Sequence, residues 1–213
     1  MNFDRLAAHY PWLELAFAGG LMQRCRTRFL NQITHCRHGL LVGEGTGKFL
    51  AQLLRVNPEI RVTCVEQSGG MIRQMRHRLR VAGLEESHVE FWEMDALDWS
   101  VTRGQYDLVA THFFLDCFRT DQLEQLVNLL AGSTRPGAVW LLTDFREPES
   151  GWRRWRAKIL LAMLYAFFKL TTRISANRLT PPDQYLESSG FRLRERRLDS
   201  LGFAHSDVWE REI

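Results

Sequence analysis

Three glycines at the end of a short apolar run constrain this chain more than any other feature. Residues 39–47 read Gly-Leu-Leu-Val-Gly-Glu-Gly-Thr-Gly, and Glu66 ends a second apolar run at 61–66. We interpret the two runs as β-strands joined by a helix. Glycine tolerates positive φ, so the backbone can turn sharply after the first strand and approach a ligand closely. An acid at the tip of the next strand can accept hydrogen bonds from ribose hydroxyls, and the pattern therefore predicts a site for an adenosine-type ligand.

The residues after the turn distinguish three kinds of nucleotide site. A Walker A loop requires glycine where Val42 stands and Ser or Thr where Phe49 stands. A dinucleotide fingerprint requires a third glycine where the chain has Lys48 or Leu50. Both patterns fail, and the pattern that remains is Gly-x-Gly-x-Gly.

This turn resembles motif I of the class I S-adenosylmethionine-dependent methyltransferases. Later segments resemble further motifs of that family in the same order, over nearly the whole chain. They are the acid-x-Ser-x-x-Met run 66–71, the strand 89–96 that ends in Asp-Ala, the strand 106–112, the Pro-Gly turn and strand 135–145, and the Gly-Phe pair 190–191. The resemblance implies S-adenosylmethionine as cofactor and methyl transfer as activity.

The resemblance also implies which residues contact the cofactor. Glu66 is expected to bind the ribose, Met71 to lie near the adenine and Asp95 to bond the adenine amino group. The family usually carries an acid at the position of Leu41, and Glu44 either replaces it at the ligand's ammonium group or faces solvent. The full expected set is Gly43, Glu44, Gly45, Thr46, Gly47, Glu66, Gln67, Met71, Asp95, Ala96 and His112.

Alternating apolar runs and turn signals predict the order of the elements. Two helices are expected within residues 6–33, because apolar residues recur there at helical spacing. The strands expected from the pattern are 39–43, 60–66, 89–94, 106–112 and 137–145, and the helices are 48–57, 69–82, 121–132 and about 152–173. Such alternation is typical of a parallel sheet with right-handed crossovers and helices on both faces. With the C-terminal hairpin that the resemblance implies, the prediction is a doubly wound, mostly parallel seven-stranded sheet.

A single domain of 213 residues is expected, with four parts. These are an N-terminal helical cap at 1–35, a cofactor-binding core at 36–146, a long helix or lid at 147–185 and an antiparallel hairpin at 186–213. Ligands bind such sheets at the carboxyl ends of the strands, so the tip of the fourth strand is expected to face the acceptor.

The candidate general base is His112, because a neutral imidazole accepts a proton near pH 7. The alternative is that His112 only lines the pocket. Phe113, Asp116 and Tyr10 are candidates for the acceptor side, as is His9, and Asp116 is alternatively a helix N-cap.

Composition is that of a globular enzyme, with 45% hydrophobic residues and a net charge of +3. This small basic excess is spread along the chain, so nucleic acid is not the expected partner. We expect a small, apolar or aromatic methyl acceptor. The alternatives are an RNA or protein methyltransferase and a non-catalytic subunit that binds an adenosyl ligand. The sequence at 111–114 is Thr-His-Phe-Phe and not an Asn-Pro-Pro-Tyr-like tetrad, which argues against base N-methylation.

The four cysteines lack the C-x-x-C pairing of a zinc site, so no metal is expected. The chain shows neither a signal-peptide pattern nor an apolar run of the roughly 18 residues needed to span a membrane, which indicates a cytoplasmic protein, either monomer or homodimer. Residues 151–169 interleave Trp and Arg before an apolar run. This segment is interpreted as a substrate lid or dimer contact, and alternatively as a peripheral membrane or lipid-binding site.

Overall fold

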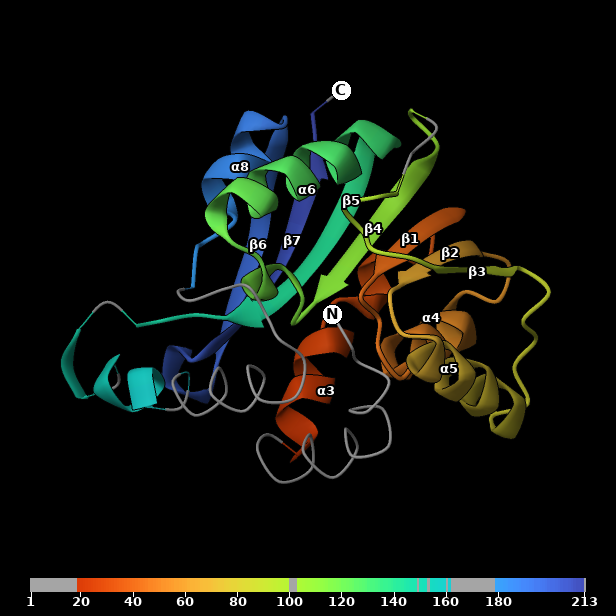
Figure 1. Cartoon of the computed structure of the whole chain (residues 1–213), viewed down its shortest axis with the longest axis horizontal. Helices are drawn as coiled ribbons and strands as arrows, with labels where there is room; N and C mark the ends of the chain where they lie inside the picture. Colours follow the sequence, from red (N-terminus) through yellow and green to blue (C-terminus); the bar gives the residue numbers. More distant parts are fainter. Residues whose placement is uncertain are drawn as a thin grey trace.

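A seven-stranded sheet forms the centre of the molecule (Figure 1). The structure is a computed structural model that describes residues 19–99, 103–148, 150–152, 154–159, 161 and 179–212. The strand order is β3-β2-β1-β4-β5-β7-β6, and neighbouring strands are parallel except in the two pairs that involve β7. The strands are β1 (His38–Val42), β2 (Arg61–Glu66), β3 (Val89–Glu93), β4 (Tyr106–His112), β5 (Thr134–Phe145), β6 (Phe191–Asp199) and β7 (Ala204–Arg211). This topology confirms the predicted fold class.

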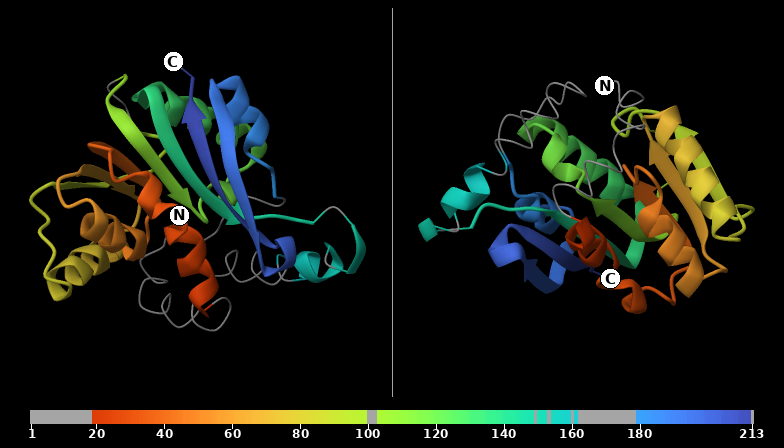
Figure 2. Two further views of the ribbon diagram at one scale, coloured as in Figure 1. Left: turned by 180° about the vertical axis from the view of Figure 1, so that it is seen from behind. Right: turned by 90° about the horizontal axis from the view of Figure 1, so that it is seen from below.

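Helices cover both faces of the sheet (Figure 2). They are α3 (Gly19–Thr27), α4 (Lys48–Val56), α5 (Gly69–Val81), α6 (Thr120–Ser133) and α8 (Asp183–Ser188). Successive strand residues point to opposite faces. Leu41 of β1 therefore packs with α4 and α5, while Leu40 and Val42 pack with α6 and α8. Both faces are buried, which explains why the central strands are continuous apolar runs.

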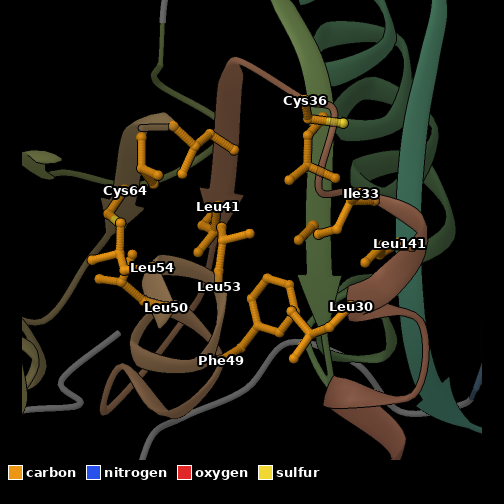
Figure 3. Close-up of a cluster of buried hydrophobic side chains, with 14 of the residues drawn as sticks. Leu30, Ile33, Cys36, Leu41, Phe49, Leu50, Leu53, Leu54, Cys64 and Leu141 are labelled. Carbon is orange, nitrogen blue, oxygen red and sulfur yellow. The ribbon is translucent and has the colours of Figure 1, made fainter. Parts of the chain in front are cut away.

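The core beneath α4 shows how the first half of the sheet is held together. Phe49, Leu50 and Leu53 of α4 lie against Leu41 of β1 and Cys64 of β2 (Figure 3). All five side chains are completely buried. Burial raises the pKa of Cys64 well above its usual range, so this residue is a small apolar core residue.

The structure differs from the prediction at two elements, the start of β5 and the helix α8. The predicted Pro-Gly turn at 135–138 is an irregularity inside β5, because Tyr106 pairs with Thr134 whereas Leu108 pairs with Val139. The strand therefore starts three residues earlier than the 137 expected from the sequence. Helix α8 was not predicted, since a helix of six residues is too short to show an amphipathic repeat.

The N-terminal part of the predicted helical cap and most of the predicted long helix lie outside the described residues. In the described residues, no helix is both long and apolar enough to cross a bilayer. The same part of the chain contains no group of three His, Cys, Asp or Glu side chains arranged to hold a metal ion. The division of the chain into cap, core, lid and hairpin stays a prediction.

Candidate active site

The three glycines between β1 and α4 share a backbone conformation but differ in their surroundings. Gly43, Gly45 and Gly47 have φ values of 67°, 64° and 75°, which residues with a side chain rarely adopt. A Cβ at Gly43 would meet the ring of Phe114, and one at Gly47 would lie 2.8 Å from Cγ of Met75. A Cβ at Gly45 would meet no atom within 4 Å. The middle glycine leaves space for a ligand, whereas the outer two are required by packing.

Glu66, at the end of β2, faces the glycine turn. This residue is 8% exposed. Its Oε2 accepts a hydrogen bond from the Gly45 N–H at 3.1 Å, and its Oε1 accepts one from the Ser68 N–H at 3.0 Å. Two backbone donors thus fix the carboxylate beside the turn, at the position expected of a residue that binds ribose hydroxyls. That binding role stays a prediction.

Glu44 has a structural role that differs from the two expected ones, contact with the ligand's ammonium group and exposure to solvent. Its Oε1 accepts hydrogen bonds from the N–H groups of Phe49 at 2.8 Å and Leu50 at 3.1 Å. These groups lie in the first turn of α4, where the helix itself supplies no partner, so Glu44 caps the helix. Burial raises the pKa of Glu44 to about 7, although the two N–H groups and the charge of Arg26 oppose the shift. This arrangement does not favour a contact between Glu44 and the ammonium group of a ligand.

The residues expected at the adenine form a second bonded group. Asp95 follows β3, and its Oδ2 accepts a hydrogen bond from Nε2 of Gln67 at 3.0 Å. Its Oδ1 accepts one from the N–H of Leu97, also at 3.0 Å. Met71, in the first turn of α5, and Ala96 are buried beside them. The loops after β2 and β3 are therefore joined through their side chains.

A cavity beside the glycine turn brings most of the expected cofactor residues together; we refer to it as the glycine-turn cavity. The expected residues that line it are Gly43, Gly45, Glu66, Gln67, Met71, Asp95 and Ala96, together with Phe113 from the acceptor-side candidates. Those that do not line it are Glu44, Thr46, Gly47 and His112. The carbonyl of Thr46 instead accepts a hydrogen bond from Nε of Arg78 at 2.8 Å.

His112 ends β4 as a buried residue. Its ring lies edge-on to Phe49, with 4.4 Å between the ring centroids. Burial, together with the positive charge of Arg26, lowers the pKa of His112 to about 3. An imidazole with this pKa is neutral at pH 7 but accepts a proton poorly. The lowered pKa argues against His112 as the general base, and His112 does not line the glycine-turn cavity, so the alternative in which it lines the pocket is not supported either.

Sequence reasoning did not identify Arg26. This residue of α3 is buried, and its guanidinium lies over the Phe113 ring at 5.3 Å from the centroid. Its charge also affects the pKa of Glu44 and of His112, so it lies near both. Arg26 stands in an arginine-rich helix with nothing in the sequence to separate it from its neighbours.

The segment 113–118, which follows β4, carries residues of two cavities. Phe113 has a φ of 55°, and the N–H of Phe114 donates to Oδ1 of Asp144 at 3.0 Å. Phe113, Phe114 and Cys117 line the glycine-turn cavity, whereas Asp116 lines a second cavity. Asp116 does not cap α6, whose N-cap residue is Arg119, so the alternative reading of Asp116 as an N-cap is wrong.

The second cavity has a volume of about 800 Å³ and lies at the carboxyl end of β5. Asp116, Asp144 and His205 line it and are each less than 9% exposed. Burial raises the pKa of Asp116 to about 6. Burial and then the neighbouring charge of Asp116 raise the pKa of Asp144 well above its usual range. A cavity of this size accommodates a small molecule.

A histidine–carboxylate pair on β7 supports this cavity. Asp207 is completely buried, and it accepts hydrogen bonds from Nδ1 of His205 at 2.9 Å and from Nε and Nη2 of Arg196 at 2.9 and 2.6 Å. Burial alone would raise the pKa of Asp207, but the bonds from His205 and Arg196 lower it. Because a carboxylate only accepts, Nδ1 of His205 carries the proton. Sequence reasoning missed this pair, although His205 and Asp207 alternate on one face of a strand.

The described part of the segment with Trp and Arg forms one wall of the second cavity. Arg154, Lys158 and Leu161 line the cavity. Arg154 and Lys158 pair with Glu147, with N–O distances of 2.5 and 3.6 Å. Trp152 is 64% exposed. The candidates Tyr10 and His9, like most of the apolar run after 159, lie outside the described residues.

Known proteins resemble this chain in sequence and in fold. Residues 40–137 match the family model of a methyltransferase domain. The chain is 25% identical over 158 residues to the carboxy-S-adenosyl-L-methionine synthase of Aeromonas hydrophila subsp. hydrophila, a match that covers 71% of this chain and 60% of that protein. Mitomycin 7-O-methyltransferase MmcR has a TM-score of 0.70 at 16% identity, with 99% of this chain and 61% of that one covered.

The fold is also that of a methyltransferase solved with its ligands. The 1,6-didemethyltoxoflavin-N1-methyltransferase of Burkholderia thailandensis, with bound 1,6-didemethyltoxoflavin and S-adenosylhomocysteine, has a TM-score of 0.69 at 13% identity, covering 98% of this chain and 85% of that one. Residues 40–137 therefore resemble a methyltransferase domain in sequence, and the chain shares the fold of these methyltransferases. It spans about 60% of the length of the curated relative.

Proposed function

We propose that the protein transfers the methyl group of S-adenosylmethionine to a small molecule held in the second cavity. The observation that carries this proposal is the shared segment 113–118. Phe114 and Cys117 line the glycine-turn cavity, and Asp116 lines the second cavity. A cofactor in the first cavity and an acceptor in the second would both contact this segment.

S-adenosylmethionine supplies a methyl group on a positively charged sulfur, so the protein's main task is alignment of the acceptor and exclusion of water. Glu66 would accept from the ribose hydroxyls, and Asp95 would accept from the adenine amino group. Gly45 would let the backbone approach the ligand, because no atom lies within 4 Å of the place of its Cβ. These contacts are expected from the geometry of the glycine-turn cavity.

The size of the second cavity supports a small-molecule acceptor. Apolar residues such as Phe145, Leu161 and Leu179 line it beside its charged groups. The mitomycin and 1,6-didemethyltoxoflavin enzymes that share the fold have names that refer to small molecules. We propose that the described residues 154–159 and 161 of the segment with Trp and Arg cover the acceptor site rather than contact a membrane, because Arg154 and Lys158 line the cavity and pair with Glu147.

Methyl transfer is tested with cell extract and methyl-labelled S-adenosylmethionine, followed by mass spectrometry of the small-molecule, RNA and protein fractions. We expect labelled product in the small-molecule fraction with the wild type and none with Gly45→Val. Label confined to RNA or protein would contradict the proposed acceptor class. Binding of S-adenosylhomocysteine without label in any fraction would indicate a non-catalytic subunit.

A further inference from the structure

We propose that the second cavity holds its acceptor by a protonated amine, which binds to Asp144 and Asp116. The inference rests on the proposed function, because it assigns a substrate class to the proposed acceptor site. The methylated atom can be this nitrogen or another atom of the same molecule. The amine is the anchoring group.

The first observation is an unsatisfied oxygen of Asp144. This residue is 2% exposed and lines the second cavity. Its Oδ1 accepts the hydrogen bond from the Phe114 N–H, but its buried Oδ2 has no hydrogen-bond partner within the described part of the chain. A buried acceptor without a partner is costly. A ligand with an N–H donor at this place would remove that cost.

The second observation is that two carboxyl groups, those of Asp144 and Asp116, line the same cavity. Asp144 and His205 are directly opposite each other in the pairing of β5 with β7, so their side chains lie on one face of the sheet. His205 donates its Nδ1–H to Asp207, so this donor does not satisfy Asp144. Asp116 adds a second carboxyl group. Burial and then the charge of Asp116 raise the pKa of Asp144, and a cation bound beside the two groups would lower that pKa and favour the charged carboxylate.

The third observation is the balance of charge. Most cationic side chains that line the cavity have acidic partners: Arg196 pairs with Asp207 and Asp183, and Arg154 and Lys158 pair with Glu147. Arg146 also lines the cavity and has no acidic partner among the described residues. No cationic side chain of the described residues pairs with Asp144. A protonated amine brings both a positive charge and three N–H donors. An alcohol brings one donor and no charge, so the carboxyl groups of Asp144 and Asp116 favour the amine.

The inference is tested with two probes of the same shape, phenethylamine and 2-phenylethanol, titrated into the full protein at neutral pH and followed by NMR. We expect the wild type to bind the amine at least ~10-fold more tightly than the alcohol, since charge-assisted hydrogen bonds contribute more than neutral ones. In Asp144→Asn, affinity for the amine should fall by about 10-fold, while that for the alcohol should not change. Equal affinity of the wild type for both probes would overturn the inference.

Asparagine keeps an oxygen for the Phe114 N–H, and thermal unfolding of the variant checks that the fold is intact. Asp98→Asn, an exposed change of the same chemistry, serves as the matched control and should retain the preference. If Asp144→Asn does not fold, Asp116→Asn is used with the same expected loss. Preference for the amine that survives in a folded Asp144→Asn or Asp116→Asn protein would also overturn the inference.

Calorimetry with S-adenosylhomocysteine separates this inference from the proposed function. Wild type and Asp144→Asn should bind this ligand equally, because Asp144 does not line the glycine-turn cavity. Labelled small-molecule product without any preference for the amine would sink the inference alone. Preference for the amine without binding of the cofactor product would sink the proposed function alone.

Discussion

The two cavities of this protein are built in opposite ways. In the glycine-turn cavity, the protein's own donors fix the acids: Glu66 accepts from Gly45 and Ser68, and Asp95 accepts from Gln67 and Leu97. In the second cavity, Asp144 keeps one buried oxygen without a partner in the described residues. The first site is ordered by local contacts in advance of a ligand. The second retains an unmet hydrogen-bonding requirement that selects its ligand.

The largest expected effect distinguishes Gly47, which packs against Met75, from Gly45, which leaves space for a ligand. In Gly47→Val, the new side chain would meet Met75, whose Cα lies 3.1 Å from the place of the Cβ, and backbone cannot yield easily. We expect a loss of about 2–5 kcal/mol of stability from overpacking and positive-φ strain. Gly45→Val carries only the strain and should lose about 1–2 kcal/mol. Denaturant unfolding measures both, and equal losses would contradict the distinction.

A second prediction concerns the acids of the glycine-turn cavity. Glu66→Ala and Asp95→Ala should each weaken binding of S-adenosylhomocysteine by about 5- to 150-fold, because each leaves ligand donors unpaired at a cost of roughly 1–3 kcal/mol. The exposed Asp98→Ala is the control. Calorimetry with the 2′-deoxyadenosyl analogue tests the ribose contact. If wild type bound the deoxy ligand as tightly as the ribo form, Glu66 would not have the assigned role.

The smallest expected effect concerns His112, at the tip of β4. Its folded pKa, lowered to about 3 by burial and Arg26, lies below the unfolded value, so the unfolded chain takes up the proton first as pH falls. Stability is therefore retained above about pH 6.5 and lost as pH decreases toward 3, with a loss of about 0.7 kcal/mol between pH 7 and pH 6. His112→Gln should remove this part of the pH dependence in denaturant unfolding. An unchanged slope would show that His112 titrates normally and would reopen its role as a base.

The cofactor side could be predicted because its residues belong to local motifs. The turn at 43–47, the acid Glu66 and the pair Asp95-Ala96 each follow a strand, and the carboxyl ends of parallel strands meet at one edge. The sequence pattern therefore predicted both the fold and most of the glycine-turn cavity. The same logic identified Asp116, since it follows the fourth strand.

The acceptor side could not be predicted because strand pairing assembles it. β7 lies between β5 and β6 and places His205 opposite Asp144, residues 61 positions apart in the chain. The spacing of residues within either strand does not predict that pairing. Two signals were nevertheless present: Asp144 stands near the end of a buried strand, and His205 alternates with Asp207. The role of Arg26 depends on where α3 docks, which an arginine-rich helix sequence does not reveal.

The most direct test of the two-cavity account is a calorimetric titration of S-adenosylhomocysteine into wild type, Gly45→Val and Asp144→Asn under identical conditions. The account predicts that wild type and Asp144→Asn bind with the same affinity and that Gly45→Val, although folded, shows no measurable binding. Unchanged affinity in Gly45→Val, or a loss in Asp144→Asn as large as in Gly45→Val, would contradict the assignment of the cofactor to the glycine-turn cavity.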